Sequence, residues 1–206
     1  MPRQTDTRAR ARAEFAAQLT ERGYLGVSLD EIAKAVDVRK ASLYHHFPGG
    51  KAALFTEVAR HYIDEAGTVL TTALDSGGTL RERLEAVVRT YAAGAYNSAL
   101  GMRVYDATRH LDDSTRTDIS RRYVDTLIAP VTALMAGAVE AGALRRADPG
   151  FLASAFLELA SVAEPLPDDV AMPPQERPEG QPAHDLVSDV VTLFLRGAAP
   201  DRPGTA

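Results

Sequence analysis

The chain has 206 residues, of which 45% are hydrophobic and none is cysteine, and its formal net charge is −5 at pH 7. This length and apolar content suffice for a buried core in one or two domains. The lack of cysteine excludes disulfides and thiolate metal sites. The longest stretch without a charged residue, 126–139, is too short to span a membrane. With no secretory signal pattern at the start, a cytoplasmic chain without membrane contact is expected.

Charge is distributed unevenly along the chain. Residues 1–60 hold 10 Lys and Arg against 7 Asp and Glu, whereas residues 61–206 hold 13 against 21. All three lysines, Lys34, Lys40 and Lys51, lie in the first part. A chance distribution of a few charges gives the same totals, but the excess of cations over 1–60 favours contact with a polyanion there.

The first helix is predicted from about Asp6 to Arg22. Ala11, Phe15 and Leu19 recur at intervals of four and form its buried stripe, and Gly23 is a typical helix stop. Residues 1–5 show no apolar pattern and are expected to form a solvated arm.

A pair of short helices is predicted between Ser28 and Phe47. Ser28 and Glu31 have the spacing of a capping box, in which each side chain accepts a hydrogen bond from the other residue's backbone N–H. Asp37 tolerates the left-handed conformation that a sharp helix exit needs, so Asp37 and Val38 are predicted to form the turn.

The second short helix, predicted over Arg39–Phe47, buries Leu43 and Phe47 at a spacing of four residues. Its other side chains carry hydrogen-bond donors rather than carboxylates. Two helices joined by a tight turn, with such a face on the second, indicate a helix-turn-helix whose second helix enters the DNA major groove. The exposed donors are Arg39, Lys40, Ser42, Tyr44, His45 and His46.

These residues resemble the DNA-binding region of the tetracycline-repressor (TetR) family of bacterial transcriptional regulators. The resemblance covers roughly the first 60 residues, and it implies an operator-binding, ligand-responsive dimer. Arg39 stands where the family usually has Ser or Thr, Asp37 stands where it has Gly, and the turn resembles the HHFPGGK variant of some members. The matching positions are Thr7, Arg8, Arg10, Gly23, Tyr24, Ser28, Ile32, Ala33, Val38, Ala41, Ser42, Leu43, Tyr44, Phe47, Lys51 and Leu54.

The predicted DNA contacts divide into two groups. Four residues near the edge of the motif are expected to touch phosphates: Ser28, Tyr44, His46 and Lys51. Four residues on the groove face are expected to touch bases: Arg39, Lys40, Ser42 and His45. Replacing Lys51 is therefore predicted to weaken binding to all sequences about equally.

After the Pro48-Gly49-Gly50 turn, a long helix is predicted from Lys51 to Leu70. Thr79 and Glu82 form a second possible capping box at the start of the next helix. A short helix from Gly101 and a long one from Asp112 or Asp113 to Gly142 follow, and Pro130 is expected to kink the latter.

Tyrosine and methionine among these alanine-rich helices leave two possibilities open. The helices can enclose a cavity for a small apolar effector, or they can pack solid, and the second is the simpler reading for any single residue. The candidate lining residues are Tyr91, Tyr96, Met102, Tyr105, Tyr123 and Met135.

The last two predicted helices, 150–164 and 183–197, are apolar around most of their circumference. They are separated by a proline-rich stretch, 164–182, which is expected to be a flexible loop. Burial of both helices inside one subunit would account for this pattern. We favour a homodimer in which the last two helices of each subunit form a four-helix contact.

The sequence therefore predicts an all-α protein. Residues 1–50 form a three-helix helix-turn-helix domain, and residues 51–206 form a larger helical domain for effector binding and dimerisation. We expect a ligand-responsive regulator, most simply a repressor, that binds a palindromic double-stranded DNA operator and an unknown small-molecule effector. No catalytic residues, metal site or cofactor are expected. The alternatives are a small helical ligand-binding protein or enzyme with an incidental helix-turn-helix, and a structural DNA-binding protein without an effector.

Overall fold

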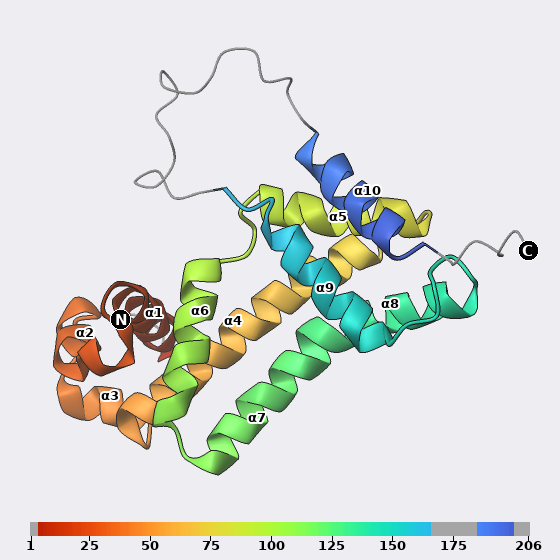
Figure 1. The fold of residues 1–206 in the computed structure, drawn as a ribbon. Coiled ribbons are helices and arrows are strands. Elements are labelled where there is room, and N and C mark those ends of the chain that lie inside the picture. The colour runs from red at the N-terminus through yellow and green to blue at the C-terminus, as the bar shows by residue number, and fades with distance from the viewer. Residues whose placement is uncertain (1–3, 166–184, 200–206) are drawn as a thin grey trace, which may run out of the picture. The chain divides into compact units, whose positions relative to one another are not determined.

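The computed structural model describes residues 4–165 and 185–199, which are helical with connecting turns and contain no strand. The all-α prediction is thus confirmed for the described residues (Figure 1). Packing divides the chain into two compact units. The first unit comprises Met1–Glu65 and Asn97–Val124, and the second comprises Ala66–Tyr96 and Asp125–Ala206. This division concerns packing, so the boundary between DNA-binding and effector regions at residue 50 stays a prediction.

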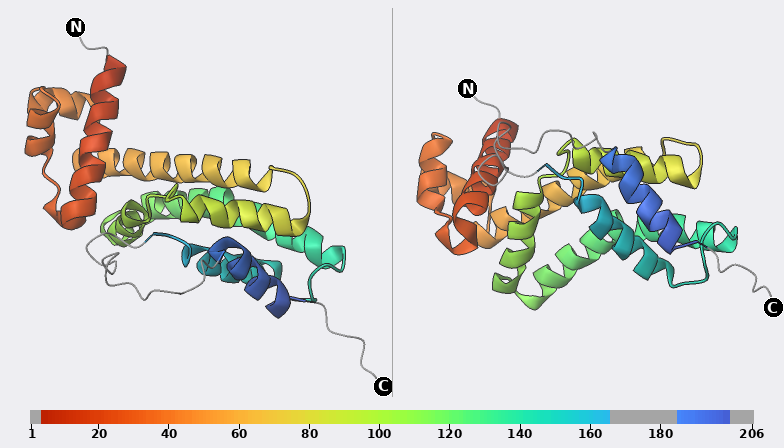
Figure 2. Two further views of the ribbon diagram at one scale, coloured as in Figure 1. Left: turned by 90° about the horizontal axis from the view of Figure 1, so that it is seen from above. Right: turned by 45° about the horizontal axis from the view of Figure 1, so that its top comes forward.

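The first unit contains the predicted helix-turn-helix. Helices α2 and α3 pack against each other and α2 packs against α1, which also contacts α6 (Figures 1 and 2). Its helices are α1 (Gln4–Gly26), α2 (Leu29–Ala35), α3 (Lys40–His46), the first part of α4 (Gly50–Leu74), α6 (Ser98–Ala107), η1 (Thr108–His110) and α7 (Asp113–Tyr123).

The core of the first unit is aliphatic and aromatic, and the predicted stripe of α1 is fully buried in it. Residues from every helix of the motif share this core with α4, so the motif rests on the long helix. The largest fully buried side chains are Phe15, Leu19, Ile32, Leu43, Phe47, Leu54, Phe55 and Ile63.

Helix α1 is broken at Gly23, as predicted, although helical residues continue for one further short turn to Gly26. Gly23 has φ 69° and ψ 173°, a conformation that a residue with a Cβ rarely adopts. The break turns the chain so that Tyr24 packs into the core, with its ring centroid 5.4 Å from that of Phe55. The Tyr24 ring also stacks on that of His110, with 5.3 Å between the ring centroids and an interplanar angle of 9°.

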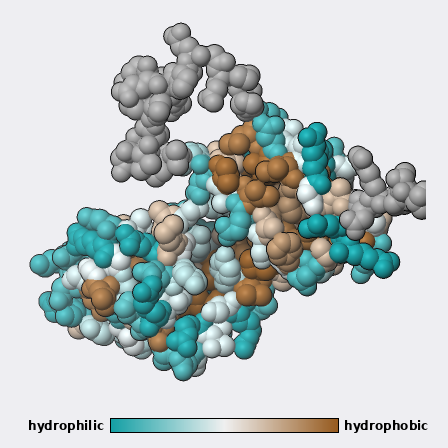
Figure 3. All heavy atoms as spheres, viewed as in Figure 1, coloured by the Kyte–Doolittle hydropathy of each residue, from teal (hydrophilic) through white to brown (hydrophobic). Residues whose placement is uncertain are grey.

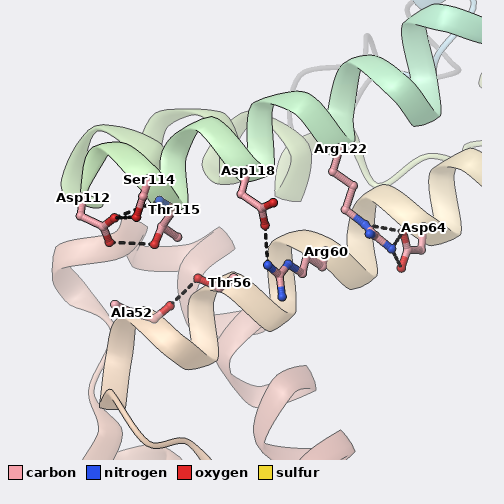
Figure 4. A network of polar contacts seen from close by, with 9 residues as sticks. All are labelled: Ala52, Thr56, Arg60, Asp64, Asp112, Ser114, Thr115, Asp118 and Arg122. Atoms are coloured by element: carbon pink, nitrogen blue, oxygen red, sulfur yellow. Dashed lines mark hydrogen bonds and ion pairs between the residues drawn. The ribbon is translucent and has the colours of Figure 1, made fainter.

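Helices α4 and α7 of the first unit are joined by alternating charges (Figure 4). Arg60 on α4 pairs with Asp118 on α7, and one turn further Asp64 on α4 pairs with Arg122 on α7. Each helix therefore carries one cation and one anion four residues apart, so this charge pattern favours the observed direction and register of the two helices.

The second unit contains the remainder of α4 and the other helices. Its core is built from the end of α4 and from α5, α8, α9 and α10; α9 contacts α5, α8 and α10, and α5 contacts α10 (Figure 2). Met135, Phe156 and Val191 are fully buried in this core. The helices are α5 (Leu80–Ala92), η2 (Val124–Ile128, whose first residue belongs to the first unit), α8 (Ala129–Glu140), α9 (Pro149–Ser161) and α10 (Leu186–Gly197).

A widened turn accompanies Pro130. The kink was predicted, and the structure shows its form: Val124–Ile128 is a π-helical turn, after which Pro130 lies in the first turn of α8. Proline has no N–H and its ring clashes with the carbonyl four residues earlier, here that of Thr126. Opening the turn by one residue relieves that clash. Gly67 of α4 faces this turn, and a Cβ at position 67 would lie 2.2 Å from Thr126 Cγ2.

Several predicted boundaries shift. The helix predicted from Gly101 begins at Ser98, because the Asn97 side chain accepts a hydrogen bond from Leu100 N and caps it earlier. Asp112 caps α7 and the box of Thr79 and Glu82 caps α5, both as predicted. The helix predicted over 183–197 begins at Leu186. The predicted loop 164–182 lies outside the described residues except for Glu164 and Pro165.

One described helical stretch, Asp113–Glu140, is long and apolar enough by length and composition alone to cross a membrane. This differs from the expectation that no segment approaches a span. It is weak grounds for a membrane protein, because a core helix of a soluble protein passes the same test. The stretch also carries Asp118 and Arg122, both ion-paired to α4.

Candidate nucleic-acid interface

The start of α2 is held by the side chain of its own N-cap, Ser28, and by two side chains of α1. Ser28 Oγ accepts a hydrogen bond from Glu31 N at 3.4 Å, which is one half of the predicted capping box. The other half of the prediction, a hydrogen bond from Ser28 N to the Glu31 carboxylate, is wrong. Ser28 N donates to Gln18 Oε1 at 3.0 Å, and the Glu31 carboxylate accepts from Arg22 Nη1 at 2.7 Å instead. The N-cap is therefore completed by α1.

The predicted turn between the two short helices is confirmed. Asp37 has φ 56°, and it is the only non-glycine residue with positive φ among those described. Val38 N donates to Ala33 O at 2.9 Å and Asp37 N donates to Lys34 O at 3.1 Å. This pair of bonds is a Schellman motif, in which the left-handed residue is usually glycine. The turn thus forms with aspartate at that position.

Helix α3 buries one side and exposes the other. Leu43 and Phe47 are 1% exposed, as predicted, so the helix is fixed on the core of the first unit. Arg39 is its N-cap, and its side chain makes no capping hydrogen bond. Of the predicted DNA-contact residues in this segment, Arg39, Lys40, Tyr44 and His45 are exposed, and Ser42 and His46 are half-buried.

Lys40 is already paired within the protein. Its Nζ donates to the Asp30 carboxylate of α2 at 2.9 Å, and both side chains are more than half exposed. This bond raises the pKa of Lys40, with a smaller contribution from the charge of Asp30. The predicted base contact by Lys40 thus competes with Asp30 for the same ammonium.

Lys51, the second residue of α4, is turned toward the protein. Its Nζ donates to Val27 O at 2.8 Å and to Leu25 O at 3.3 Å, and it lies 4.8 Å from the centroid of the Tyr24 ring. Burial lowers the pKa of the Lys51 ammonium. The sequence placed this residue among the phosphate contacts, whereas in the free protein its ammonium is directed to two backbone carbonyls.

Three residues of α1 make contacts that the sequence did not predict. Gln18 is 4% exposed and links α1 to the start of α2. Arg8 pairs with Glu57 of α4 and lies over the Phe47 ring, and Arg10 donates to Ala35 O at 3.2 Å. Only Gln18 had a signal, because it lies three residues after Phe15 on the buried stripe.

The six candidate effector residues are divided between the units. Tyr91, Tyr96 and Met135 lie in the second unit, where the two tyrosine rings are 4.5 Å apart and Met135 is fully buried. Burial raises the pKa of Tyr96, and the nearby Thr90 side chain lowers it by less. The buried Tyr96 hydroxyl makes no hydrogen bond of normal geometry within the described residues, because its approach to Thr90 falls outside that geometry. Met102, Tyr105 and Tyr123 lie in the first unit and are 72%, 80% and 45% exposed.

Residues 13–58 match the sequence family described as bacterial regulatory proteins, tetR family. The HTH-type transcriptional repressor KstR2 of Rhodococcus jostii (strain RHA1) is 30% identical over 131 residues, which cover 63% of this chain and 62% of that repressor. The match therefore spans less than two thirds of the relative's length.

Solved structures share the fold over nearly the whole chain. A tetR-family regulatory protein from Rhodococcus RHA1 superposes with a TM-score of 0.73 at 20% identity, covering 94% of this chain and 97% of that one. AibR, solved in complex with isovaleryl coenzyme A and operator DNA, superposes with a TM-score of 0.64 at 22% identity, covering 93% and 97%. Residues 13–58 therefore match the tetR family of bacterial regulatory proteins, and the chain shares its fold with solved tetR-family structures.

Proposed function

We propose that this protein is a transcriptional regulator that places α3 in the major groove of an operator and responds to a small-molecule effector. The observation that carries the proposal is the two-sided α3, with Leu43 and Phe47 buried and donor-bearing side chains exposed on the outside. Arg39, Ser42 and His45 are assigned to bases, and Ser28, Tyr44 and His46 to phosphates. Repression is the proposed action, since KstR2 is named a repressor.

Selection of bound DNA from a random pool tests the proposal directly. We expect enrichment of an inverted repeat whose half-sites lie one helical turn, about 34 Å, or a multiple of it apart. The affinity for the selected site should exceed that for a scrambled one by at least about 1,000-fold. A pool that shows no enrichment over several rounds would refute operator binding.

We further propose that the regulator is a homodimer through α9 and α10. Large apolar side chains remain exposed on or beside these helices in the single chain, and hydrophobic residues gather over them in Figure 3. A patch of this kind is typical of an interface between subunits. The exposed residues are Phe151 (59%), Val162 (64%), Leu186 (43%) and Leu193 (63%).

Sedimentation of charged variants tests the dimer. Phe151→Asp and Leu193→Asp should sediment as monomers at micromolar concentration, where the unmodified chain is a dimer. Met102→Asp is the matched control, because Met102 is 72% exposed but lies on α6 in the first unit. A monomeric unmodified chain, or a control variant that dissociates equally, would contradict this interface.

The effector is proposed to bind in the second unit beside Tyr91, Tyr96 and Met135. A buried hydroxyl without a partner, such as that of Tyr96, costs free energy that a ligand oxygen can recover. Acyl coenzyme A thioesters are the first compounds to screen, since AibR was solved with one. Thermal shifts that are lost in Tyr96→Phe would support the assignment. A regulator of this kind is expected to be cytoplasmic and non-enzymatic.

A further inference from the structure

The ammonium of Lys51 completes the end of α1. Carbonyls in the last turn of a helix have no intrahelical donor and need another partner. Lys51 Nζ donates to Leu25 O, in the last turn of α1, at 3.3 Å and to Val27 O, just beyond the helix, at 2.8 Å. A lysine side chain often serves the last carbonyls of a helix, but here it comes from a different helix.

These contacts use most of the donor capacity of Lys51. An ammonium has three N–H donors and no acceptor. Two of them reach the carbonyls, and the charge lies 4.8 Å from the centroid of the Tyr24 ring, within the range of a cation–π contact. Tyr24 itself packs against Phe55 of α4, so ring and ammonium form one contact between α4 and the end of α1.

The carbonyl of Val27 belongs to the peptide that joins Val27 to Ser28. The same peptide's N–H, that of Ser28, donates to Gln18 Oε1 at 3.0 Å. One peptide is thus held by α4 through its oxygen and by α1 through its nitrogen. Since Ser28 is the N-cap of α2, this double attachment fixes where α2 begins and, through the Asp37 turn, where α3 lies.

We propose that Lys51 is a positioning residue for the reading helix and makes no phosphate contact. This inference rests on the proposed DNA-binding function. Lys51 sets the placement of α2 and α3 on α4, and it acts on DNA only through them. Its loss should therefore reduce discrimination between operator and non-operator DNA, whereas loss of a phosphate contact weakens both alike.

Two variants of Lys51 and one of Arg39 test the inference. Lys51→Met keeps the aliphatic stem and removes the charge, and Lys51→Arg restores a cation. Arg39→Met is the comparison, because Arg39 is an exposed cation whose side chain caps nothing. Affinities for the selected operator and a scrambled duplex are measured over a salt series, with thermal unfolding of the free proteins alongside.

We expect Lys51→Met to lose about tenfold in operator affinity but roughly twofold or less for the scrambled duplex. The slope of log K against log salt should stay within about 0.3 of that of the unmodified chain, because each lost phosphate contact lowers it by about 0.9. The free protein should melt at a lower temperature. Lys51→Arg should recover part of the operator affinity, and Arg39→Met should melt like the unmodified chain.

Two outcomes would overturn the inference. A slope reduced by about one, with equal losses on both duplexes and an unchanged melting temperature, would make Lys51 a phosphate contact. A lower melting temperature with the operator preference intact would make it a purely structural residue. Failure of the unmodified chain to select any DNA refutes the proposed function instead, and the melting comparison still reports whether the Lys51 contacts stabilise the first unit.

Discussion

The guanidinium of Arg122 on α7 donates two hydrogen bonds to the carboxylate of Asp64 on α4, from Nε at 2.9 Å and from Nη2 at 2.7 Å. This fork is the best-formed of the contacts between the two helices (Figure 4). A bidentate pair holds a planar geometry that a single contact does not, so it restrains both helices even at a half-exposed surface.

A double-mutant cycle with Asp64→Ala and Arg122→Ala measures that coupling. Exposed ion pairs contribute about 0.2–1 kcal/mol, and the forked geometry favours the upper half of this range at low salt. The coupling should shrink as salt screens the charges. The Glu85–Arg89 pair within α5 is the matched control, with about 0.3–0.5 kcal/mol expected for an i,i+4 pair. Zero coupling between Asp64 and Arg122 at low salt would show that the fork does not restrain the helices.

The close approach of Gly67 to the π-turn leads to a second prediction. Gly67→Ala should destabilise the protein by about 1–3 kcal/mol, because its Cβ overlaps Thr126 Cγ2. Thr126→Ser removes that methyl group, so the double variant should regain most of the loss. Gly137→Ala on α8 is the control: nothing lies within 4 Å of its Cβ position, and alanine should stabilise the helix by about 0.5–1 kcal/mol. Urea unfolding of the four proteins measures these differences, and equal effects at positions 67 and 137 would contradict the packing argument.

Asp112 should contribute stability that depends on pH. Its carboxylate accepts hydrogen bonds from Ser114 Oγ, Thr115 N and Thr115 Oγ1, which hold the pKa of Asp112 far below its ordinary value of 3.8. A carboxyl whose pKa is lower in the folded state stabilises the fold above its unfolded pKa and loses that effect as the pH falls toward the folded value.

Asp112→Asn keeps an acceptor for the N-cap and removes the charge. The melting temperature of the unmodified chain should exceed that of the variant at pH 7, and the difference should narrow steadily below about pH 4. Thermal scans between pH 7 and pH 2.5 measure it. A constant difference over this range would mean that the charge of Asp112 has no part in stabilising α7.

The bond between Asp30 and Lys40 predicts a gain of affinity. Asp30→Asn removes an anion from α2 and frees the Lys40 ammonium, so binding to any duplex should strengthen several-fold, with a salt slope steeper by up to about one. Glu31→Gln removes the same charge from the next residue, but Glu31 pairs with Arg22, so Lys40 is not released. Filter-binding titrations should show the larger gain for Asp30→Asn. Equal gains for Asp30→Asn and Glu31→Gln would show that the effect comes from the change in net charge and not from release of Lys40.

The two capping boxes show how far local patterns predict structure. The box of Thr79 and Glu82 forms as the spacing predicts, and no other residue in the described part of the chain is hydrogen-bonded to either side chain at that exposed helix start. The box of Ser28 and Glu31 forms by half, since Gln18 takes the Ser28 N–H and Arg22 takes the Glu31 carboxylate. Both competitors come from α1. The spacing of residues along the chain does not predict partners that tertiary packing brings together.

The candidate site shows the same difference between features set by local sequence and contacts set by tertiary packing. Burial of Leu43 and Phe47, the turn at Asp37 and the exposure of Arg39 and His45 follow from periodicity and backbone preference, and these predictions agree with the structure. The attachments of Lys40 to Asp30 and of Lys51 to Val27 O do not, because they depend on how three helices approach one another. Sequence thus identifies which donors lie in the motif, and packing decides which of them are available.

The parallel rings of Tyr24 and His110 make the motif observable in solution. The chain has no tryptophan and five histidines, so imidazole proton resonances in a one-dimensional NMR spectrum are few. The ring of His110 lies 5.3 Å from that of Tyr24, and the aromatic ring current should displace its signals upfield. His45 on α3 is exposed and should resonate near its random-coil position until DNA covers it. Two resolved signals would then report separately on the integrity of the domain and on occupancy of its groove-facing helix.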